Sequence, residues 1–224
     1  MDTGDIADTG HTCEFGDTIL LLNEIPKKNE MNTPITSEQL FVAFRKKGHL
    51  VTDFNPFGIR RNDNVDKWTD IRGLLRKVNG VWELYQWDAT TKPGLSALLK
   101  PVNPAGCAIL KEGQYINCWK RGLHNGHDAL VQCADIRVYR DNHKDGKIYF
   151  DNEQVATPAC GINLHSTWAS NIPDWDGEYP TVGNWSEGCQ VIARPSDNVK
   201  FIAMCKASNL KWFNYSLFNI NDLV

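Results

Sequence analysis

The feature that most limits the fold is a pair of apolar stretches separated by Asn79-Gly80. In residues 71–78 and 81–87 the apolar side chains recur with a period close to two, which is typical of half-buried β-strands. Asn-Gly favours the type I′ turn of a two-residue hairpin. This stretch therefore predicts a β-hairpin, and it is the clearest secondary-structure signal in the chain.

Further short apolar runs, bounded by Gly and Pro turns, follow the hairpin. We expect strands at 107–110, 129–132, 136–139, 147–150 and 161–165. Pro195-Ser196 begins a short helix, because Ser196 and Asp197 can cap it. Roughly six to eight short strands with few helices predict a mostly-β domain.

The N-terminal part of the chain differs in composition from the rest. Residues 1–35 are rich in Asp, Thr, Gly and Asn, which predicts an arm that is either disordered alone or docked on a partner. Residues 36–67 predict an extension made of a helix, with Ser37 as a candidate cap, and a loop over 51–66. Residues 68–224 are expected to form the main domain.

Composition excludes several classes of protein. The net charge of −3 gives no electrostatic case for nucleic acid or an anionic membrane surface. The acidic residues 1–8 do not resemble a signal peptide, and no apolar run approaches the roughly 18 residues of a membrane span. The seven cysteines include no Cys-x-x-Cys pair, so we expect mostly buried free thiols in a protein made in a reducing cytoplasm.

One histidine and one cysteine stand out as a candidate reactive pair. Alternation in 161–166 puts Asn163 and His165 on one face of a short strand. Cys189 follows Gly188, which permits a sharp turn that could project the thiol from the end of a strand. A cysteine needs a base beside it to be a good nucleophile at neutral pH, and His165 could supply it. The plainer interpretation is a partly buried histidine and an inert buried thiol.

These residues resemble a known family. His165-Ser166 followed by Ser186-Glu187-Gly188-Cys189 resembles the catalytic signature of the L,D-transpeptidases (YkuD type), and is closest to phage-encoded members with a Ser-x-Gly-Cys-Gln turn. The resemblance covers roughly 68–210, with specific motifs only in 161–191. It implies a β-sandwich-like domain with an N-terminal arm and helix. Cys189 would be the nucleophile, His165 the base, and the Ser166 carbonyl the group that orients the imidazole.

The resemblance also implies which groups meet the substrate. Backbone amides near Gly188 and Cys189, in a turn that Ser186 can hydrogen-bond, would face an oxyanion. Substrate-binding candidates are Glu187, Gln190, Trp185, Asn163, His124 and Arg194. Two family positions differ here: Glu187 replaces a histidine, and Val191 replaces an arginine or asparagine. The interval between His165 and Cys189 is also longer than usual, and its Trp- and Asp-bearing segment predicts either a lid or a surface loop.

The implied reaction is acyl transfer. Cys189 would attack a peptide carbonyl in the peptidoglycan stem, and the acyl group would pass either to water, in a hydrolase, or to an amine, in a transpeptidase. A phage-encoded enzyme favours hydrolysis, which would open the wall as a virion component or at host lysis. One alternative is a virion structural or accessory protein that keeps the fold without catalysis, with the arm contacting other virion proteins. Another is a cysteine peptidase that acts on protein.

Two further clusters could hold a metal ion. His124 and His127 lie close in sequence, but no third ligand is in register, so we expect no metal there. Residues 141–151, with Asp141 and Asp145, resemble a calcium loop, although His143 replaces an oxygen ligand and the twelfth position lacks a glutamate. A plain Asp/Asn/Gly turn is the alternative, and we otherwise expect no cofactor.

Overall fold

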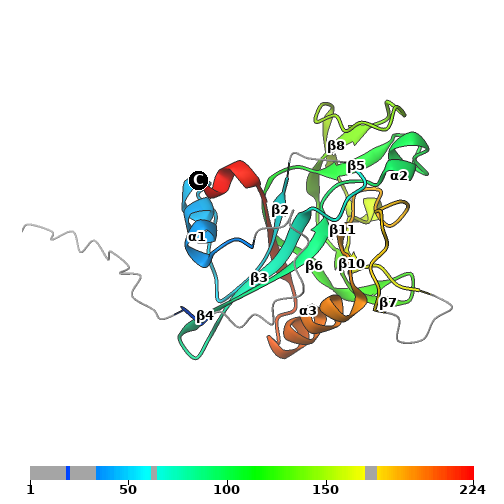
Figure 1. Ribbon diagram of the computed structural model, residues 1–224. Coiled ribbons are helices and arrows are strands. Elements are labelled where there is room, and N and C mark those ends of the chain that lie inside the picture. The colour runs from blue at the N-terminus through cyan, green and yellow to red at the C-terminus, as the bar shows by residue number, and fades with distance from the viewer. Residues whose placement is uncertain (1–18, 21–33, 62–64, 170–175) are drawn as a thin grey trace, which may run out of the picture.

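A computed structural model describes residues 19–20, 34–61, 65–169 and 176–224 (Figure 1). The fold is mostly β, with one large and one small sheet and few helices, as the sequence predicts. A single apolar cluster contains side chains of both sheets and of the third helix, among them Leu110, Trp119, Leu164 and Phe201. This shared core gives the fold its β-sandwich-like character.

The large sheet closes on itself. Its strands, in spatial order, are β1 (Ile19–Leu20), β4 (Val81–Thr90), β11 (Gln190–Ile192), β10 (Leu164–Ser166), β7 (His127–Gln132), β6 (Gly113–His124), β12 (Phe213–Asn219), β2 (Phe54–Arg60) and β3 (Asp70–Val78). Because β3 also pairs with β4, the strands from β4 to β3 form a closed ring, and the two-residue strand β1 adds to β4 outside it. Closure pairs strands that would otherwise be sheet edges.

The small sheet lies at the opposite end of the molecule from α1 (Figure 1). It consists of β5 (Cys107–Leu110), β8 (Ile136–Asp141) and β9 (Glu153–Ala156), all antiparallel. The short helix α2 (Leu95–Leu99) lies beside it. The Ala108 N–H donates to the Glu187 carbonyl, so β5 also supports the turn that precedes β11.

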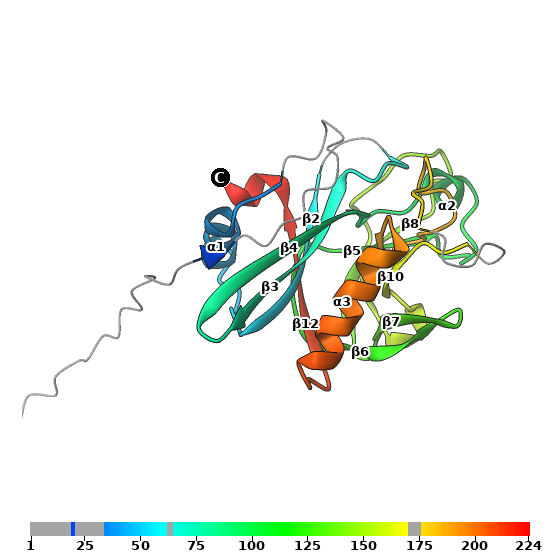
Figure 2. The ribbon, with the colours of Figure 1, turned by 60° about the horizontal axis from the view of Figure 1, so that its bottom comes forward.

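Helices α1 and α3 both pack against the large sheet. The first, α1 (Ser37–Lys46), is capped by Thr36 in a capping box with Gln39, so the expected cap at Ser37 is wrong by one residue. It contacts the C-terminal 3₁₀ helix η2 (Ile220–Leu223). Helix α3 (Pro195–Ala207) runs alongside β7, β10 and β11 (Figure 2). In the described part of the chain, no helix is long and apolar enough to cross a bilayer.

The predicted hairpin is confirmed. Strands β3 and β4 pair from Asp70–Ala89 to Val78–Val81, and Asn79 and Gly80 both have positive φ, at 51° and 84°.

Other expectations are corrected by the structure. The segment 51–66 is not a loop throughout, because it contains the buried strand β2. Pro56 is tolerated there since pairing with β12 begins only at Phe57, after the proline. Residues 147–150 form no strand, and the smaller sheet uses β9 instead. Of the predicted arm, the structure describes β1, which pairs with β4 of the same chain, and residues 34–35; Ile35 is buried.

A buried arginine joins distant strands. Arg72, in β3, is 2% exposed, and its Nη1 donates to the carbonyls of His165 (2.9 Å) and Gln190 (3.0 Å). Its guanidinium also lies 4.9 Å from the centre of the Phe201 ring. Burial lowers the pKa of Arg72 to about 10, so it stays charged at neutral pH. One side chain therefore ties β3 to the strand pair β10–β11.

We expect Arg72→Met to lower the free energy of unfolding by about 3 kcal/mol, because two buried carbonyls lose charge-assisted hydrogen bonds. Arg76→Met is the control on the same strand, since Arg76 pairs with Glu83 in a partly exposed position and should cost no more than about 1 kcal/mol. Urea unfolding of both variants measures the difference. Equal losses would contradict the role assigned to Arg72.

Candidate active site

The parallel pairing of β10 and β11 brings the two candidate residues together. His165 lies opposite Val191 in the ladder, and Leu164 lies opposite Gln190. Cys189 comes directly before β11, and the Gln190 N–H donates to the Asn163 carbonyl. The thiol is therefore held beside the start of β10. This register converts two residues that are distant in sequence into neighbours.

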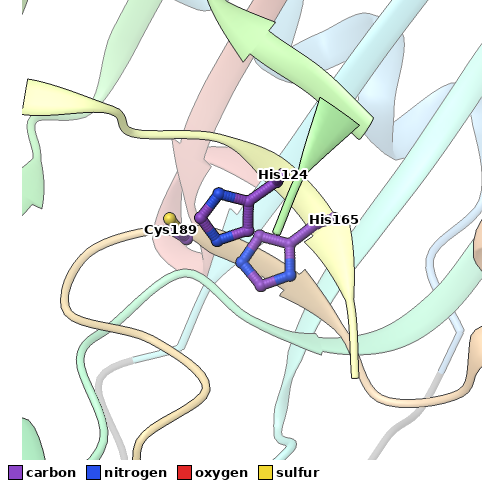
Figure 3. Close-up of side chains that lie close together, drawn as sticks. All are labelled: His124, His165 and Cys189. Carbon is purple, nitrogen blue, oxygen red and sulfur yellow. The ribbon is translucent and has the colours of Figure 1, made fainter. Parts of the chain in front are cut away.

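A third side chain joins them. A ring nitrogen of His124, a ring nitrogen of His165 and the Cys189 sulfur all lie within 4.8 Å of one another. Figure 3 shows the two imidazoles converging beside the sulfur. His124 is the last residue of β6, before the Asn125-Gly126 turn, and its ring centre lies 4.5 Å from that of His165. Two strands, β6 and β10, and the residue directly before β11 thus contribute to one cluster.

The hydrogen bonding of His165 fixes its tautomer. Its Nδ1 lies 2.8 Å from the Ser166 carbonyl, and a carbonyl can only accept, so Nδ1 carries the proton. Nε2 then presents a lone pair. This atom is buried and has no hydrogen-bond partner among the described residues. Burial, with a smaller contribution from His124, lowers the pKa of His165 to about 3. His165 is therefore a neutral base with its lone pair inside the cluster.

The thiol is also neutral at rest. The Asn163 N–H donates to the Cys189 sulfur at 3.4 Å, and the thiol donates to the Gly161 carbonyl at 3.4 Å. Burial raises the pKa of Cys189 to about 11, and the Asn163 N–H offsets only part of that rise. A neutral thiol beside a neutral imidazole is the arrangement for general-base activation of the thiol when a substrate binds.

The turn before the cysteine differs from the expectation in one respect. The Gly188 N–H donates to the Ser186 hydroxyl oxygen at 3.0 Å, and that hydroxyl donates to the Cys189 carbonyl at 2.8 Å. The Gly188 amide is therefore occupied within the turn and does not face an oxyanion. Gly188 has a φ of 141°, and a Cβ there would come within 1.9 Å of the Ala108 carbonyl oxygen. The glycine is required by the close approach of β5.

A cavity of about 560 Å³ opens onto the thiol. Four of the predicted site residues line it, namely His124, Trp185, Glu187 and Cys189. It is also lined by Arg140 and Cys160, which sequence reasoning missed; the Arg140 guanidinium lies 3.1 Å from the Cys160 sulfur. Strand alternation does not distinguish Arg140 from an arginine that faces solvent. The cavity thus holds one cation and one carboxylate, Glu187, near the thiol.

Three of the predicted substrate-binding residues do not line this cavity. Gln190 is fully buried, where its amide donates to the Gly188 carbonyl and accepts from the Tyr215 hydroxyl. Arg194 precedes α3 and pairs with Glu178. Asn163 is buried and binds His124 through its side chain. Gln190 and Asn163 position the site, because both hydrogen-bond to groups that surround the thiol.

The carboxylates of the predicted calcium loop accept hydrogen bonds from other groups of the same loop. Asp141 accepts hydrogen bonds from the His143 and Tyr149 N–H groups, and Asp145 accepts from the Lys147 N–H and the Tyr149 hydroxyl. These contacts are those of an Asp-rich turn. The calcium interpretation stays a prediction.

Comparison with known proteins adds no assignment. No protein-family model, curated protein or solved structure matches the chain. The family resemblance therefore depends on the motif residues around His165 and Cys189, and it stays an expectation.

We expect the stability of the protein to fall in acid because of His165. The ordinary pKa of histidine is 6.5, so below that value the unfolded chain takes up a proton that the folded site refuses until about pH 3. Relative to His165→Gln, the wild type should lose about 2 kcal/mol of unfolding free energy between pH 7 and pH 5.

Urea titrations at both pH values measure this difference. His143→Gln is the contrast, because Asp141 raises the pKa of the exposed His143, so the wild type should instead gain stability relative to that variant as the pH falls. A wild type whose difference from His165→Gln is independent of pH would contradict the buried, neutral imidazole.

We expect Gly188→Ala to cost about 3 kcal/mol or more, because the new methyl group collides with the Ala108 carbonyl in addition to straining the backbone. Gly80→Ala is the matched control, since Gly80 has a φ of 84° with no atom near the added Cβ, and should cost about 1 kcal/mol. Chemical denaturation compares them. If both cost the same, the close approach at β5 is not a constraint.

Proposed function

We propose that the protein is a cysteine-dependent enzyme that hydrolyses amide bonds in the peptide stems or cross-links of bacterial peptidoglycan. The observation that carries the proposal is a His165 ring nitrogen within 4.8 Å of the Cys189 sulfur, on a ring whose Nε2 is buried and without a partner among the described residues. A buried unpaired acceptor is costly, so its place beside a thiol at a cavity favours a catalytic role.

The proposed reaction uses only groups of the chain and water. The thiol proton moves from Cys189 to His165 Nε2 while the sulfur bonds to the carbonyl carbon, and the carbonyl electron pair moves to oxygen. The intermediate then collapses, the C–N bond breaks, and His165 returns the proton to the leaving amine. Water attacks the thioester with His165 again as base, which releases the acid and restores the thiol.

The resting distance requires one movement. His165 Nε2 has no hydrogen-bond partner among the described residues, so the Cys189 thiol, which lies within 4.8 Å of a nitrogen of that ring, must move to reach it. The Asn163 N–H and Gly161 carbonyl that hold the sulfur at rest are weak partners at 3.4 Å each. Their loss is therefore a small cost when substrate fills the cavity.

Residues that line the cavity support a charged peptide as substrate. Arg140 could bind a carboxylate and Glu187 could bind an ammonium group, since both line the same cavity as Cys189. Stem peptides carry both kinds of group. We further propose, from the resemblance to phage-encoded proteins, that the enzyme acts at infection or lysis.

A second candidate is a virion structural or accessory protein that keeps this fold without catalysis. The observation that favours it is the pKa of about 11 at Cys189, which burial raises above the ordinary value of a thiol. Among the residues that the structure describes, none forms an ion pair with the sulfur. The two candidates differ in whether substrate binding brings the thiol and His165 together.

We expect purified protein to release soluble peptides from bacterial sacculi, and Cys189→Ala to lower the rate at least about 1000-fold because no nucleophile remains. His165→Gln should lower it by a similar factor. Cys133→Ala is the control, since Cys133 is a free thiol that does not line the cavity. Chromatography of the digest identifies the bond cleaved.

Three outcomes separate the candidates. If the protein digests casein but leaves sacculi intact, it is a cysteine peptidase that acts on protein, and the peptidoglycan proposal is wrong. Intact sacculi and intact casein would favour the non-catalytic alternative. Digestion that survives Cys189→Ala would remove this residue from the mechanism.

A further inference from the structure

Only one of the two clustered imidazoles faces the cavity. His124 lines it together with Cys189, whereas His165 is 1% exposed and is not among the lining residues. The two rings pack side by side at 4.5 Å, and Figure 3 shows them next to the sulfur. His124 is therefore the imidazole that a bound substrate would meet first.

The side chain of Asn163 determines which His124 nitrogen carries the proton. The Gln132 N–H donates to Asn163 Oδ1 at 3.1 Å, so the amide oxygen faces that backbone group. The amide NH₂ is then turned toward His124 Nδ1, at 3.0 Å. Because an amide NH₂ can only donate, His124 Nδ1 accepts. In the neutral ring the proton is therefore on Nε2.

The neutral form of His124 is the favoured one. Burial, and then the nearby His127, lowers the pKa of His124. The ring is held in place by His165 and by Trp168, whose centre lies 6.1 Å away in an edge-to-face contact. The cluster thus holds two imidazoles of opposite tautomer, one with a free lone pair and one with a free N–H.

We infer that His124 Nε2–H donates a hydrogen bond to the substrate carbonyl oxygen and stabilises the oxyanion that forms when Cys189 attacks. This inference rests on the proposed function and names a catalytic residue for it. His124 would take the place of the Gly188 N–H, which is occupied by Ser186. Since a His124 ring nitrogen lies within 4.8 Å of the sulfur, an oxygen on the attacked carbon fits between them, about 3 Å from the donor.

The same contacts oppose a metal ion at this cluster. To bind a metal through Nε2, His124 would have to move its proton to Nδ1, which faces the Asn163 NH₂. Turning the amide around would pair its NH₂ with the Gln132 N–H, and both buried donors would lose their acceptors. The hydrogen bonds therefore favour a donor at His124 over a ligand.

Two reagents separate this role from a structural one. Acylation of Cys189 by p-nitrophenyl acetate passes through an oxyanion, whereas alkylation by iodoacetamide does not. We expect His124→Leu to lower the acylation rate constant about 100-fold and to leave the alkylation rate constant nearly unchanged. His124→Gln, which keeps an N–H near the Nε2 position, should retain most of the acylation rate.

Mass spectrometry of the labelled peptide assigns both modifications to Cys189, with Cys189→Ala as the blank, and thermal unfolding checks that the variants fold. If His124→Leu slows both reactions equally, the donor role is overturned while the proposed enzyme stands. Equal acylation rate constants for His124→Leu and the wild type would also overturn the donor role and leave the proposed enzyme standing. A wild-type Cys189 that is alkylated but never acylated would overturn both the donor role and the proposed enzyme.

Discussion

Two hydrogen bonds from the Arg72 guanidinium, to the carbonyls of His165 and Gln190, are the contact on which the rest of the site depends. They join β3, at the closing seam of the large sheet, to the short strands β10 and β11. Those strands have three residues each, too few to be held by their own ladder. A cation on their carbonyls fixes the pair through the backbone and makes no hydrogen bond to the His165 ring or the Cys189 thiol.

Burial shifts the pKa values of the two central residues of this site in opposite directions. It lowers the pKa of His165 and raises that of Cys189, so both groups are neutral before substrate arrives. The site is therefore not an ion pair that reacts with any electrophile. A bound carbonyl, together with an N–H donor, would be needed to make transfer of the thiol proton favourable. Selectivity would then come from binding and not from a reactive thiol.

Sequence reasoning recovered the parts of the fold that local pattern controls. The Asn79-Gly80 hairpin follows from its turn residues, and the pairing of His165 with Ser166 follows from the motif. Helix α3 forms where it was expected, but Ser196 and Asp197 do not cap it, because the helix begins at Pro195 with Arg194 as its N-cap and no side-chain cap. Strand β2 was missed because Pro56 and Gly58 signal a loop, and only its position between β12 and β3 makes it a strand. Long-range pairing of this kind leaves no periodic signal in a single chain.

Within the site, side-chain contacts between distant parts of the chain likewise leave no signal in the sequence. The motif indicated Gln190 and Arg194 as substrate contacts, yet one is enclosed by Tyr215 and the other precedes α3. The occupied Gly188 amide and the orientation of the Asn163 amide could not be read from residue types, because each depends on a hydrogen-bond partner elsewhere in the fold. Geometry was needed to assign donors and acceptors.

The parallel arrangement of β10 and β11 also has a consequence for how such chains can vary. Parallel neighbours must be joined by a crossover, which leaves one end of the first strand and returns to the start of the second. Residues can be gained or lost along that path while the register of the two strands, and hence the separation of the imidazole and the sulfur, stays constant. The number of residues between the histidine and the cysteine is therefore a poor guide to whether they meet. The pairing register of the two strands is a better guide.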